Sequence, residues 1–207
     1  MKRRLILLLK AAVSIAIGFL IAYVLLLRPW HHRWVATDAE VRATLPGDSL
    51  VAATSQITHG ITVNACPEKI WPWLMQIGQD RSGFYSYTPL ENLFGCEMPK
   101  VEALKPEWKP RAEGETVWFC APEHFKGQGY MVAAVVELHK AFVMVSGPDR
   151  AMLRSGGRAA GGSWGFVLQA IDPNHTRLLG GAFWDPAQFF MERRMLKTIK
   201  HLAETTS

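Results

Sequence analysis

One apolar run near the N-terminus constrains this chain more than any other feature of its sequence. Residues 5–27 read LILLLKAAVSIAIGFLIAYVLLL and carry a single charge, Lys10. As an α-helix the run is about 34 Å long, enough to cross a hydrocarbon core about 30 Å thick. Fifteen of its residues are Leu, Ile, Val or Phe. Each favours insertion by about 0.3–0.6 kcal/mol, which outweighs the roughly 3 kcal/mol that one Lys costs. We therefore predict a transmembrane anchor over residues 1–28.

A cleaved secretory signal is the competing interpretation, because residues 1–4 are positively charged ahead of the apolar run. The run is longer than the roughly 7–15 apolar residues of such signals, and it ends in Leu-Leu-Leu-Arg-Pro-Trp without a small-residue cleavage site. We favour an uncleaved, single-pass anchor in the cell (inner) membrane. The bases before the span favour a cytoplasmic N-terminus and a domain on the periplasmic or extracellular side, although Arg28 and Arg33 follow the span closely.

Charged and aromatic side chains on both sides of the span are typical of a membrane interface. The bases ahead of the span and in its first turns can reach the headgroups, and the aromatic residues after it can form a belt. We expect the following residues to face the membrane or its interface: Lys2, Arg3, Arg4, Lys10, Tyr23, Arg28, Trp30 and Trp34.

The net charge of +5 belongs to the first 28 residues of the chain. They contain five bases and no acid, which leaves 18 bases and 18 acids in residues 29–207. A neutral domain argues against a nucleic-acid partner, because binding phosphates requires an excess of Lys and Arg on one face. The remaining length suits one domain, and a hydrophobic content of 49% argues against disorder.

The three cysteines, Cys66, Cys96 and Cys120, form no C-x-x-C pair and cannot all be paired within one chain. A disulfide framework therefore does not hold the fold together. Two alternatives stay open: one bridge among the three, if the domain is exported, or buried free thiols acting as small hydrophobes.

The remaining sequence predicts a tether and one globular domain. Residues 29–50 are polar and interrupted by prolines and a glycine, which is typical of a tether. The domain over residues 51–207 begins with an alternating, strand-like stretch at 55–64. Helical spacing then predicts a short helix over 68–77 and another over 87–94, with Thr88 as the N-cap of the second.

Five further strands and a long helix complete the prediction. Short turns at His139-Lys140 and Pro173-Asn174 indicate antiparallel hairpins. The strands are expected at residues 116–120, 130–138, 141–146, 163–171 and 176–184. A helix over 187–203 follows Asp185-Pro186, a strong start signal. This order predicts an α+β fold in which a curved antiparallel sheet of about six strands closes over a long C-terminal helix.

Three stretches of the sequence resemble a known family. They read Trp34-Val-Ala-Thr37-x-x-Glu40 followed by Leu45-Pro-Gly-Asp48, then Ile70-Trp-Pro-Trp-Leu-x-Gln76-x-Gly78-x-x-Arg81-x-Gly83-Phe-Tyr-Ser-Tyr87-x-x-Leu90-Glu-Asn-Leu93-x-Gly95, and Met191-Glu-Arg-Arg-Met-Leu196. Together with the element order, they resemble the START-like, helix-grip superfamily, also called SRPBCC, and within it a group of largely uncharacterised bacterial members.

The resemblance covers most of residues 34–203 and not the anchor. It departs from the pattern at Val35, where Gly is expected, and over residues 121–129. This superfamily includes lipid-transfer domains, plant pathogenesis-related proteins and polyketide cyclases. The resemblance implies a helix-grip fold with a cavity between sheet and long helix that usually holds an apolar or amphipathic ligand. Transfer, binding, cyclisation and structural roles all occur on this fold, so the fold alone does not choose among them.

Motifs for cofactors, metals and nucleophilic catalysis are missing from the sequence. The glycine-rich stretch at 156–163 has Gly162 where a phosphate loop needs its lysine, and it lies between two predicted strands. The seven histidines are scattered, with no H-E-x-x-H motif, and no G-x-S-x-G elbow is present. We therefore expect no cofactor and no metal.

The most informative polar residues are Arg81, Tyr85, Tyr87, Glu91 and Asn92, at the junction of the two short helices. In a helix-grip fold this junction lies near one mouth of the cavity, where polar groups orient an apolar ligand. The alternative is structural, with an Arg–Glu pair and tyrosine hydroxyls tying the corner to the sheet. The tryptophans likewise fill the core or contact a ligand. The candidate ligand-binding residues are Trp73, Arg81, Tyr85, Tyr87, Glu91, Trp118, Trp164 and Trp184.

Three hypotheses about function follow. The first is a membrane-anchored domain that binds a lipid or similar hydrophobic small molecule, without catalysis. The second is a structural accessory subunit of a larger membrane protein complex. The third is a cyclase- or hydrolase-like enzyme that uses Glu91 or a tyrosine for acid–base chemistry in an apolar pocket. The first is favoured, and its expected partners are the lipid bilayer and an apolar small molecule.

Overall fold

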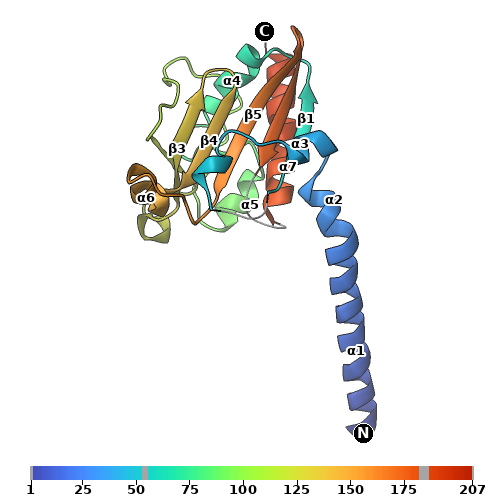
Figure 1. The fold of residues 1–207 in the computed structure, drawn as a ribbon. Coiled ribbons are helices and arrows are strands. Elements are labelled where there is room, and N and C mark those ends of the chain that lie inside the picture. Colours follow the sequence, from blue (N-terminus) through green and yellow to red (C-terminus); the bar gives the residue numbers. More distant parts are fainter. Residues whose placement is uncertain (1, 53–55, 182–186, 207) are drawn as a thin grey trace.

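The computed structural model describes residues 2–52, 56–181 and 187–206 of the chain. A long N-terminal helix projects from a globular domain (Figure 1). It begins as α1 (Lys2–Ala22), widens into the π-helical segment η1 (Tyr23–Leu27) and continues as α2 (Arg28–His32). The stretch Ile6–His32 is long and apolar enough to cross a membrane, and its most apolar window is not buried against the rest of the protein.

The π-helical segment ends at Leu27, two residues before Pro29. In a regular α-helix the proline ring would clash with the carbonyl four residues earlier, on Leu25. The Arg28 backbone N–H instead donates to the carbonyl of Tyr23, five residues back. The chain thus stays helical past the proline and enters the domain without a loop.

The domain is built on one six-stranded antiparallel sheet with the order β1-β6-β5-β4-β3-β2. Its strands are β1 (His59–Val63), β2 (Thr116–Trp118), β3 (Tyr130–Glu137), β4 (Ala141–Ser146), β5 (Ser163–Asp172) and β6 (His175–Gly181). Strands β2 to β6 pair in chain order, and β1 closes the edge beside β6. This arrangement confirms the predicted α+β fold with its six-stranded sheet.

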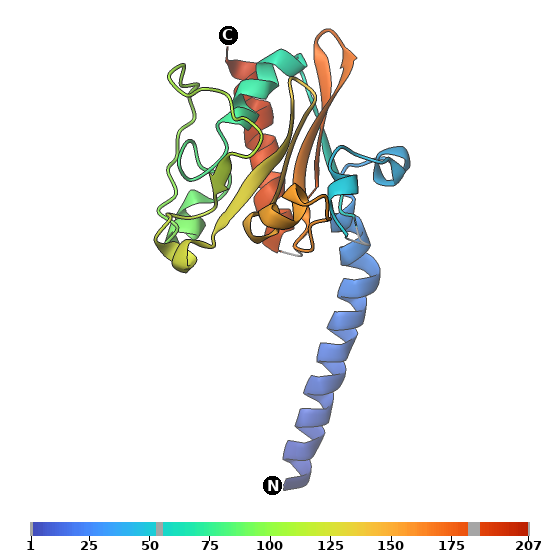
Figure 2. The same cartoon turned by 60° about the vertical axis from the view of Figure 1, so that its left-hand side comes forward.

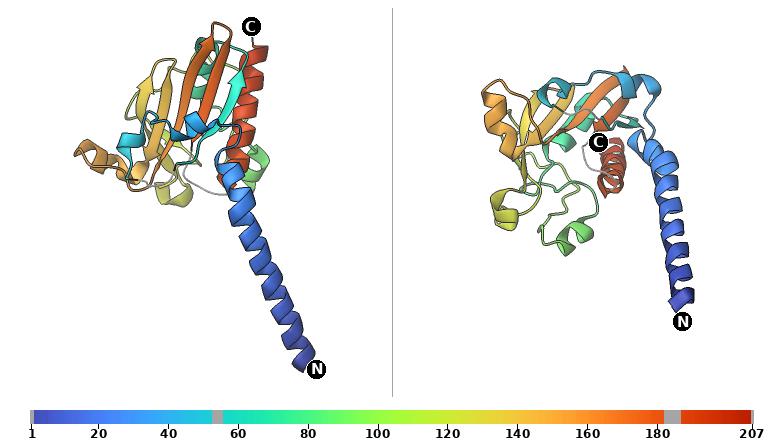
Figure 3. Two further views of the ribbon diagram at one scale, coloured as in Figure 1. Left: turned by 45° about the vertical axis from the view of Figure 1, so that its right-hand side comes forward. Right: turned by 60° about the horizontal axis from the view of Figure 1, so that its bottom comes forward.

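The long helix α7 (Ala187–Thr205) lies along one face of the sheet, beside β1 and α4 (Pro67–Met75). The right-hand view of Figure 3 shows α7 below the sheet. The largest fully buried side chains include Trp73, Leu74, Phe142, Phe166, Leu178, Met195, Leu196 and Ile199. The core therefore fills the space between the sheet, α4 and α7. The remaining helical elements are α3 (Asp38–Arg42), η2 (Asp48–Leu50), α5 (Thr88–Leu93), η3 (His124–Gly127), η4 (Gly147–Asp149) and α6 (Arg150–Arg154).

The expected elements occur in the expected order, with changes at their ends. The strand over 141–146 is found with the same bounds, and the last helix extends to Thr205. The N-cap of α5 is Tyr87 and not Thr88, which lies inside the helix and is followed by Pro89. Helix α6 was not expected, because it has only five residues and a glycine-rich stretch follows it closely. Residues 182–184 of the last predicted strand lie outside the described residues.

The segment expected as a tether is folded against the sheet. Its helix α3 begins with a complete capping box between Thr37 and Glu40. The Glu40 carboxylate accepts from Arg177 Nε of β6 at 2.7 Å. Trp34, expected at the membrane interface, is 8% exposed and belongs to the core. Its carbonyl accepts from the Gly60 backbone N–H of β1, and Arg193 of α7 lies over its ring at 5.3 Å from the centroid.

Candidate ligand-binding pocket

An apolar pocket of about 360 Å³ lies between α5, the start of β5 and the first half of α7. Helix α5, which borders the pocket, is the short green helix near the lower left of the domain in Figure 2. Its lining is mostly aromatic side chains, methionines and cysteines: Phe84, Ser86, Leu90, Glu91, Phe94, Cys96, Met98, Phe119, Cys120, Trp164, Gln188, Met191 and Met195. Within this lining, Glu91 is the one ionisable carboxyl group.

Glu91 is held in the pocket by its position on the inner side of α5. The residue is 7% exposed, although it is an acid in a short helix whose apolar neighbours are exposed. Its Oε2 is buried and has no hydrogen-bond partner among the described residues. Burial raises the pKa of the Glu91 carboxyl to about 7. The group therefore changes protonation near neutral pH and is available to a donor or an acceptor on a bound molecule.

Two constraints fix the loop that follows α5. The Asn92 side chain donates to the carbonyl of Met98 at 3.1 Å, and its amide oxygen accepts from the Met98 backbone. A disulfide joins Cys96 to Cys120, and both cysteines line the pocket. Cys66 is free. The bridge answers the question that the sequence left open, and it forms part of the pocket wall.

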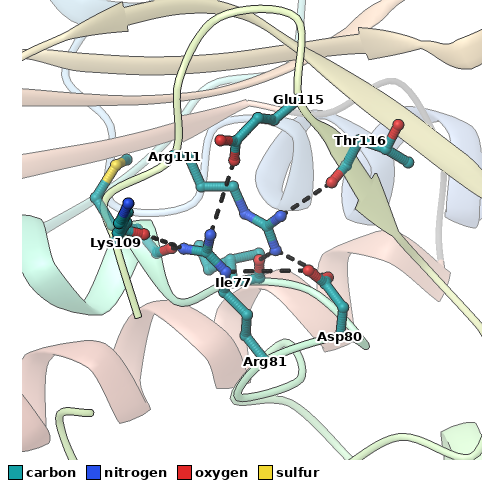
Figure 4. A network of polar contacts seen from close by, with 8 residues as sticks. Ile77, Asp80, Arg81, Lys109, Arg111, Glu115 and Thr116 are labelled. Carbon is teal, nitrogen blue, oxygen red and sulfur yellow. Dashed lines mark hydrogen bonds and ion pairs between the residues drawn. The ribbon is translucent and has the colours of Figure 1, made fainter. Parts of the chain in front are cut away.

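Arg81 lies outside the pocket, in a polar corner at the C-terminal end of α4 (Figure 4). Its Nη1 donates to the carbonyl of Met75 at 2.6 Å and to that of Lys109 at 2.9 Å. Nearby acids add ion pairs with Asp80 and Glu115 at 3.9 and 3.7 Å. Burial, together with a neighbouring arginine, lowers the pKa of Arg81. The Met75 carbonyl is at the C-terminal end of α4, where carbonyls lack partners within the helix, and the Lys109 carbonyl belongs to a loop, so Arg81 ties this loop to the helix end.

The neighbouring arginine is Arg111, which sequence reasoning missed. Its side chain is 3% exposed and donates to the carbonyls of Ile77 and Thr116 at 2.8 and 2.9 Å. It also pairs with Asp80 at 2.8 Å. Gly78 makes room for this pair, because a Cβ there would lie 2.7 Å from the Arg111 Nη2. Sequence spacing could not have predicted this contact, because Arg111 and Asp80 are 31 residues apart in the chain.

The predicted tyrosines and tryptophans separate into pocket and core residues. Trp164 lines the pocket and stacks on Phe84 at 5.4 Å between ring centroids. Trp73 is fully buried in the core, and the Tyr85 hydroxyl donates to its carbonyl at 3.2 Å. Burial raises the pKa of Tyr85. Trp118 packs on Tyr130 across two strands, outside the pocket lining.

Two more of the predicted residues lie elsewhere. Tyr87 is exposed and lines a shallower depression with Pro89, Leu90, Phe190 and Met191. Trp184 lies outside the described residues. Of the eight candidates, the structure therefore brings Glu91 and Trp164 together in the pocket.

Sequence reasoning missed most of the apolar lining of the pocket. Phe84, Met98 and Phe119 come from loops and strand ends, where no periodicity marks the inner face. Met191 and Met195 are four residues apart on α7, so their helical spacing did predict one shared face. What that face encloses depends on α5, which is about 100 residues away in sequence.

A second buried acid, Glu192, points away from the pocket. Its carboxylate lies 3.4 Å from His59 Nδ1, and both side chains are almost fully buried. The other ring nitrogen of His59 is bonded to the carbonyl of His31 at 2.6 Å. Burial alone lowers the pKa of His59, but Glu192 and that carbonyl raise it above its usual value. This pair joins β1, α7 and the end of the N-terminal helix.

The residues expected at the membrane interface lie along the N-terminal helix. Arg3, Arg4, Lys10 and Arg28 are exposed, and the side chain of Lys2 lies outside the described part of the structure. Tyr23 is bonded to His31, and Trp30 packs on Phe189 of α7 at 5.4 Å between ring centroids. Among the described residues, no group of three or more His, Cys, Asp or Glu side chains could hold a metal ion.

Comparison with known proteins gives similarity at the level of solved structures alone. No protein-family model matches the chain, and no curated protein matches it. An Aha1 dimer from Colwellia psychrerythraea is 18% identical with a TM-score of 0.43, over 73% of this chain and 98% of that chain. A conserved protein of unknown function from Enterococcus faecalis is 15% identical with a TM-score of 0.42, over 75% of each chain. Similarity at this level carries no information about function.

Proposed function

We propose that this chain is a membrane-anchored, START-like domain that binds an apolar or amphipathic small molecule, such as a lipid, in the pocket between the sheet, α5 and α7. The observation that carries the proposal is the pocket itself. Its volume of about 360 Å³ falls within the range of small-molecule sites, roughly 300–1,000 Å³. Its wall is apolar except for a few polar groups, which is the usual composition of a site for a hydrophobic ligand.

Glu91 gives the pocket its polar specificity. A carboxyl with a pKa of about 7 is neutral in part of the population at neutral pH, so that it can donate as well as accept a hydrogen bond. Its buried oxygen lacks a partner among the described residues, which is costly unless a ligand or water supplies one. A ligand with an apolar body and one hydroxyl or amine group fits this wall.

One feature supports the membrane anchor, and a second supports the side of the membrane on which the domain lies. The helix Ile6–His32 has the length and hydropathy of a membrane span. The Cys96–Cys120 disulfide favours an oxidising compartment, which agrees with a domain on the periplasmic side. A fusion of alkaline phosphatase after residue 207 should therefore be active in cells. An inactive phosphatase, with a fluorescent cytoplasmic reporter at the same position, would contradict this orientation.

Mass spectrometry of the purified full-length protein tests the binding function. Wild-type protein extracted in mild detergent should retain a small apolar molecule. Met191→Trp should lose it, because the larger ring fills the pocket from α7. Met152→Trp is the matched control, since it makes the same change at an exposed residue of α6. Wild-type protein that carries no such molecule, and takes up neither a fluorescent long-chain alcohol nor a fluorescent long-chain amine, would contradict the proposal.

The raised pKa of Glu91 supports a second candidate function, general acid–base catalysis on the bound molecule. A carboxyl with a pKa near the working pH is suited to proton transfer. Once the ligand is identified, incubation with wild-type protein should convert it, and Glu91→Gln should bind it without conversion. A ligand that wild-type protein returns unchanged would exclude catalysis and leave binding.

A further inference from the structure

Helix α5 carries its polar and apolar residues on the wrong sides for a helix in water. Its acid, Glu91, is buried, while Leu93 is 78% exposed and Phe94, directly after the helix, is 69% exposed. Leu90 is also exposed. In a water-facing helix the apolar residues point to the core and the acid to the solvent. The outer face of α5 is therefore apolar, as is typical of a surface that is covered and not exposed to water.

Two neighbouring segments extend this apolar surface. Segment η3 lies against the end of α5, since a Cβ on Gly95 would be 2.7 Å from the His124 ring. The next residue, Phe125, is exposed. On the other side, Phe190 of α7 shares a depression with Leu90. We call this surface the end patch, defined as Leu90, Leu93, Phe94, Phe125 and Phe190. A contiguous exposed apolar surface of this kind marks an interaction site.

The end patch lies at the end of the domain from which the N-terminal helix leaves. Phe189, the neighbour of Phe190 on α7, packs against the rings of Trp30 and His31 at 5.4 and 5.3 Å between centroids. Figures 2 and 3 show α5 and the first turns of α7 at the end of the domain where the N-terminal helix joins it. The opposite end holds the β3–β4 and β5–β6 turns.

The domain is held very close to any membrane that this helix crosses. The apolar run ends at Leu27, and four residues later His31 is buried in the domain with its carbonyl bonded to His59. Four helical residues rise about 6 Å. The polar headgroup layer on each side of a bilayer is about 5–8 Å thick. No flexible linker separates the span from the domain, so the end patch is placed at the headgroup level.

We propose that the end patch docks on the bilayer that the N-terminal helix spans. The proposal rests on the membrane anchoring proposed above, but not on what the pocket holds. A basic residue flanks the patch, because Arg194 of α7 lies over the ring of Tyr87 at 6.0 Å from its centroid. Such residues pair with anionic headgroups around an apolar contact. Leu90 and Phe94 also line the pocket, so docking makes the pocket open toward lipid.

Labelling at matched exposed positions tests the docking. Full-length protein with Cys66→Ser and Leu93→Cys is labelled with an environment-sensitive fluorophore, with the disulfide kept oxidised. It is then reconstituted into phosphatidylcholine–phosphatidylglycerol vesicles with or without brominated acyl chains. The control is Leu138→Cys, a 66% exposed leucine in the β3–β4 turn at the far end of the sheet. A second label, at Phe125→Cys, serves if the change at position 93 perturbs α5.

Brominated lipid should quench the labels at positions 93 and 125 several-fold more than the label at position 138. Quenching at position 93 and position 125 no greater than at position 138 would overturn the proposal, whether those labels then face water or a second copy of the chain. Extraction with alkaline carbonate separates this failure from failure of the anchor. Protein that stays in the vesicles without quenching contradicts docking alone, and protein that is released contradicts the anchoring as well.

Discussion

The two polar regions beside α4 and α5 differ in whether their charged groups find partners within the protein. At the end of α4, Arg81 and Arg111 donate to four backbone carbonyls and pair with Asp80. On α5, Glu91 is equally enclosed but has a buried oxygen without a partner among the described residues. Both groups are buried charges or potential charges, and burial is costly for each unless it is paired.

Under the function proposed above, this difference separates a region that stabilises the fold from a region that binds a ligand. The guanidinium groups of Arg81 and Arg111 donate to carbonyls and to a carboxylate of the protein, although the buried Nε of Arg111 has no hydrogen-bond partner among the described residues. A carboxyl group that faces an apolar pocket with a raised pKa keeps its hydrogen-bonding capacity for another molecule. The residues are close in sequence, so the direction of each side chain, and not its position in the chain, separates the two roles.

Removal of Arg111 should have the largest effect on stability. Arg111→Met leaves the carbonyls of Ile77 and Thr116 without this donor and removes the closer of the two ion pairs of Asp80. We expect the free energy of unfolding to fall by about 3–5 kcal/mol. Urea unfolding in detergent, followed by tryptophan fluorescence, measures this change. Arg154→Met, at an exposed residue of α6, is the control, and an equal effect of the two substitutions would contradict the assigned role.

Removal of Arg81 should destabilise the fold less and leave the pocket intact. Arg81→Met loses the two bonds to the carbonyls of Met75 and Lys109, worth about 2–3 kcal/mol together. Folded protein at low temperature should still carry its ligand, as measured by mass spectrometry. Loss of the ligand from a variant with unchanged stability would move Arg81 into the binding site and remove the contrast with Glu91.

The Glu91 carboxyl should make stability fall as pH rises. Glutamate in the unfolded chain ionises near pH 4.5, whereas in the fold it stays protonated until about pH 7. Between these values the folded state binds more protons, so the free energy of unfolding of ligand-free protein should decrease by about 2 kcal/mol, allowing for solvent at the pocket mouth.

The substitution Glu91→Gln should remove this part of the pH dependence, because the amide keeps the volume and does not titrate. The measurement is urea unfolding of both proteins at intervals from pH 5 to pH 8. His59, whose pKa is raised despite its burial, because of Glu192 and the His31 carbonyl, is unchanged in both proteins, so the difference between the two profiles isolates Glu91. Parallel profiles of the two proteins would show that the carboxyl has an ordinary pKa.

The smallest effect is expected at Tyr85, a pocket candidate by sequence that lies in the core. Tyr85→Phe removes one hydrogen bond to the carbonyl of Trp73 and should cost about 1 kcal/mol. The ligand content of the folded variant should match that of wild type by mass spectrometry. A variant that is as stable as wild type but lacks ligand would place the hydroxyl in the pocket.

Periodicity predicted most of the fold but could not predict the site. The strand at 141–146, the helix that begins at Ala187 and the short helix around Glu91 follow from local patterns of apolar residues and turn signals. Trp34 shows the limit of such patterns, because its place after an apolar run suggests a membrane belt. Its burial depends instead on pairing between its carbonyl and β1.

The residues that the sequence grouped into one candidate site have different surroundings in the structure. Sequence proximity grouped Arg81, Tyr85 and Glu91, whereas the structure directs one to carbonyls, one to the core and one to the pocket. Arg111 and the Cys96–Cys120 bridge were beyond prediction because their partners lie tens of residues away. Contacts of that range are set by how the sheet and its helices pack.

The sequence by itself determined the apolar N-terminal helix, the α+β fold and the neutral charge of the domain, because these follow from composition and from local repeats of apolar residues. The tertiary structure alone decided that Glu91 Oε2 lacks a partner among the described residues, that the end patch lies beside the point where the N-terminal helix meets the domain, and that Arg81 donates to the carbonyls of Met75 and Lys109. Burial and hydrogen-bond satisfaction depend on which distant segments meet, and a local pattern of residues does not record that information.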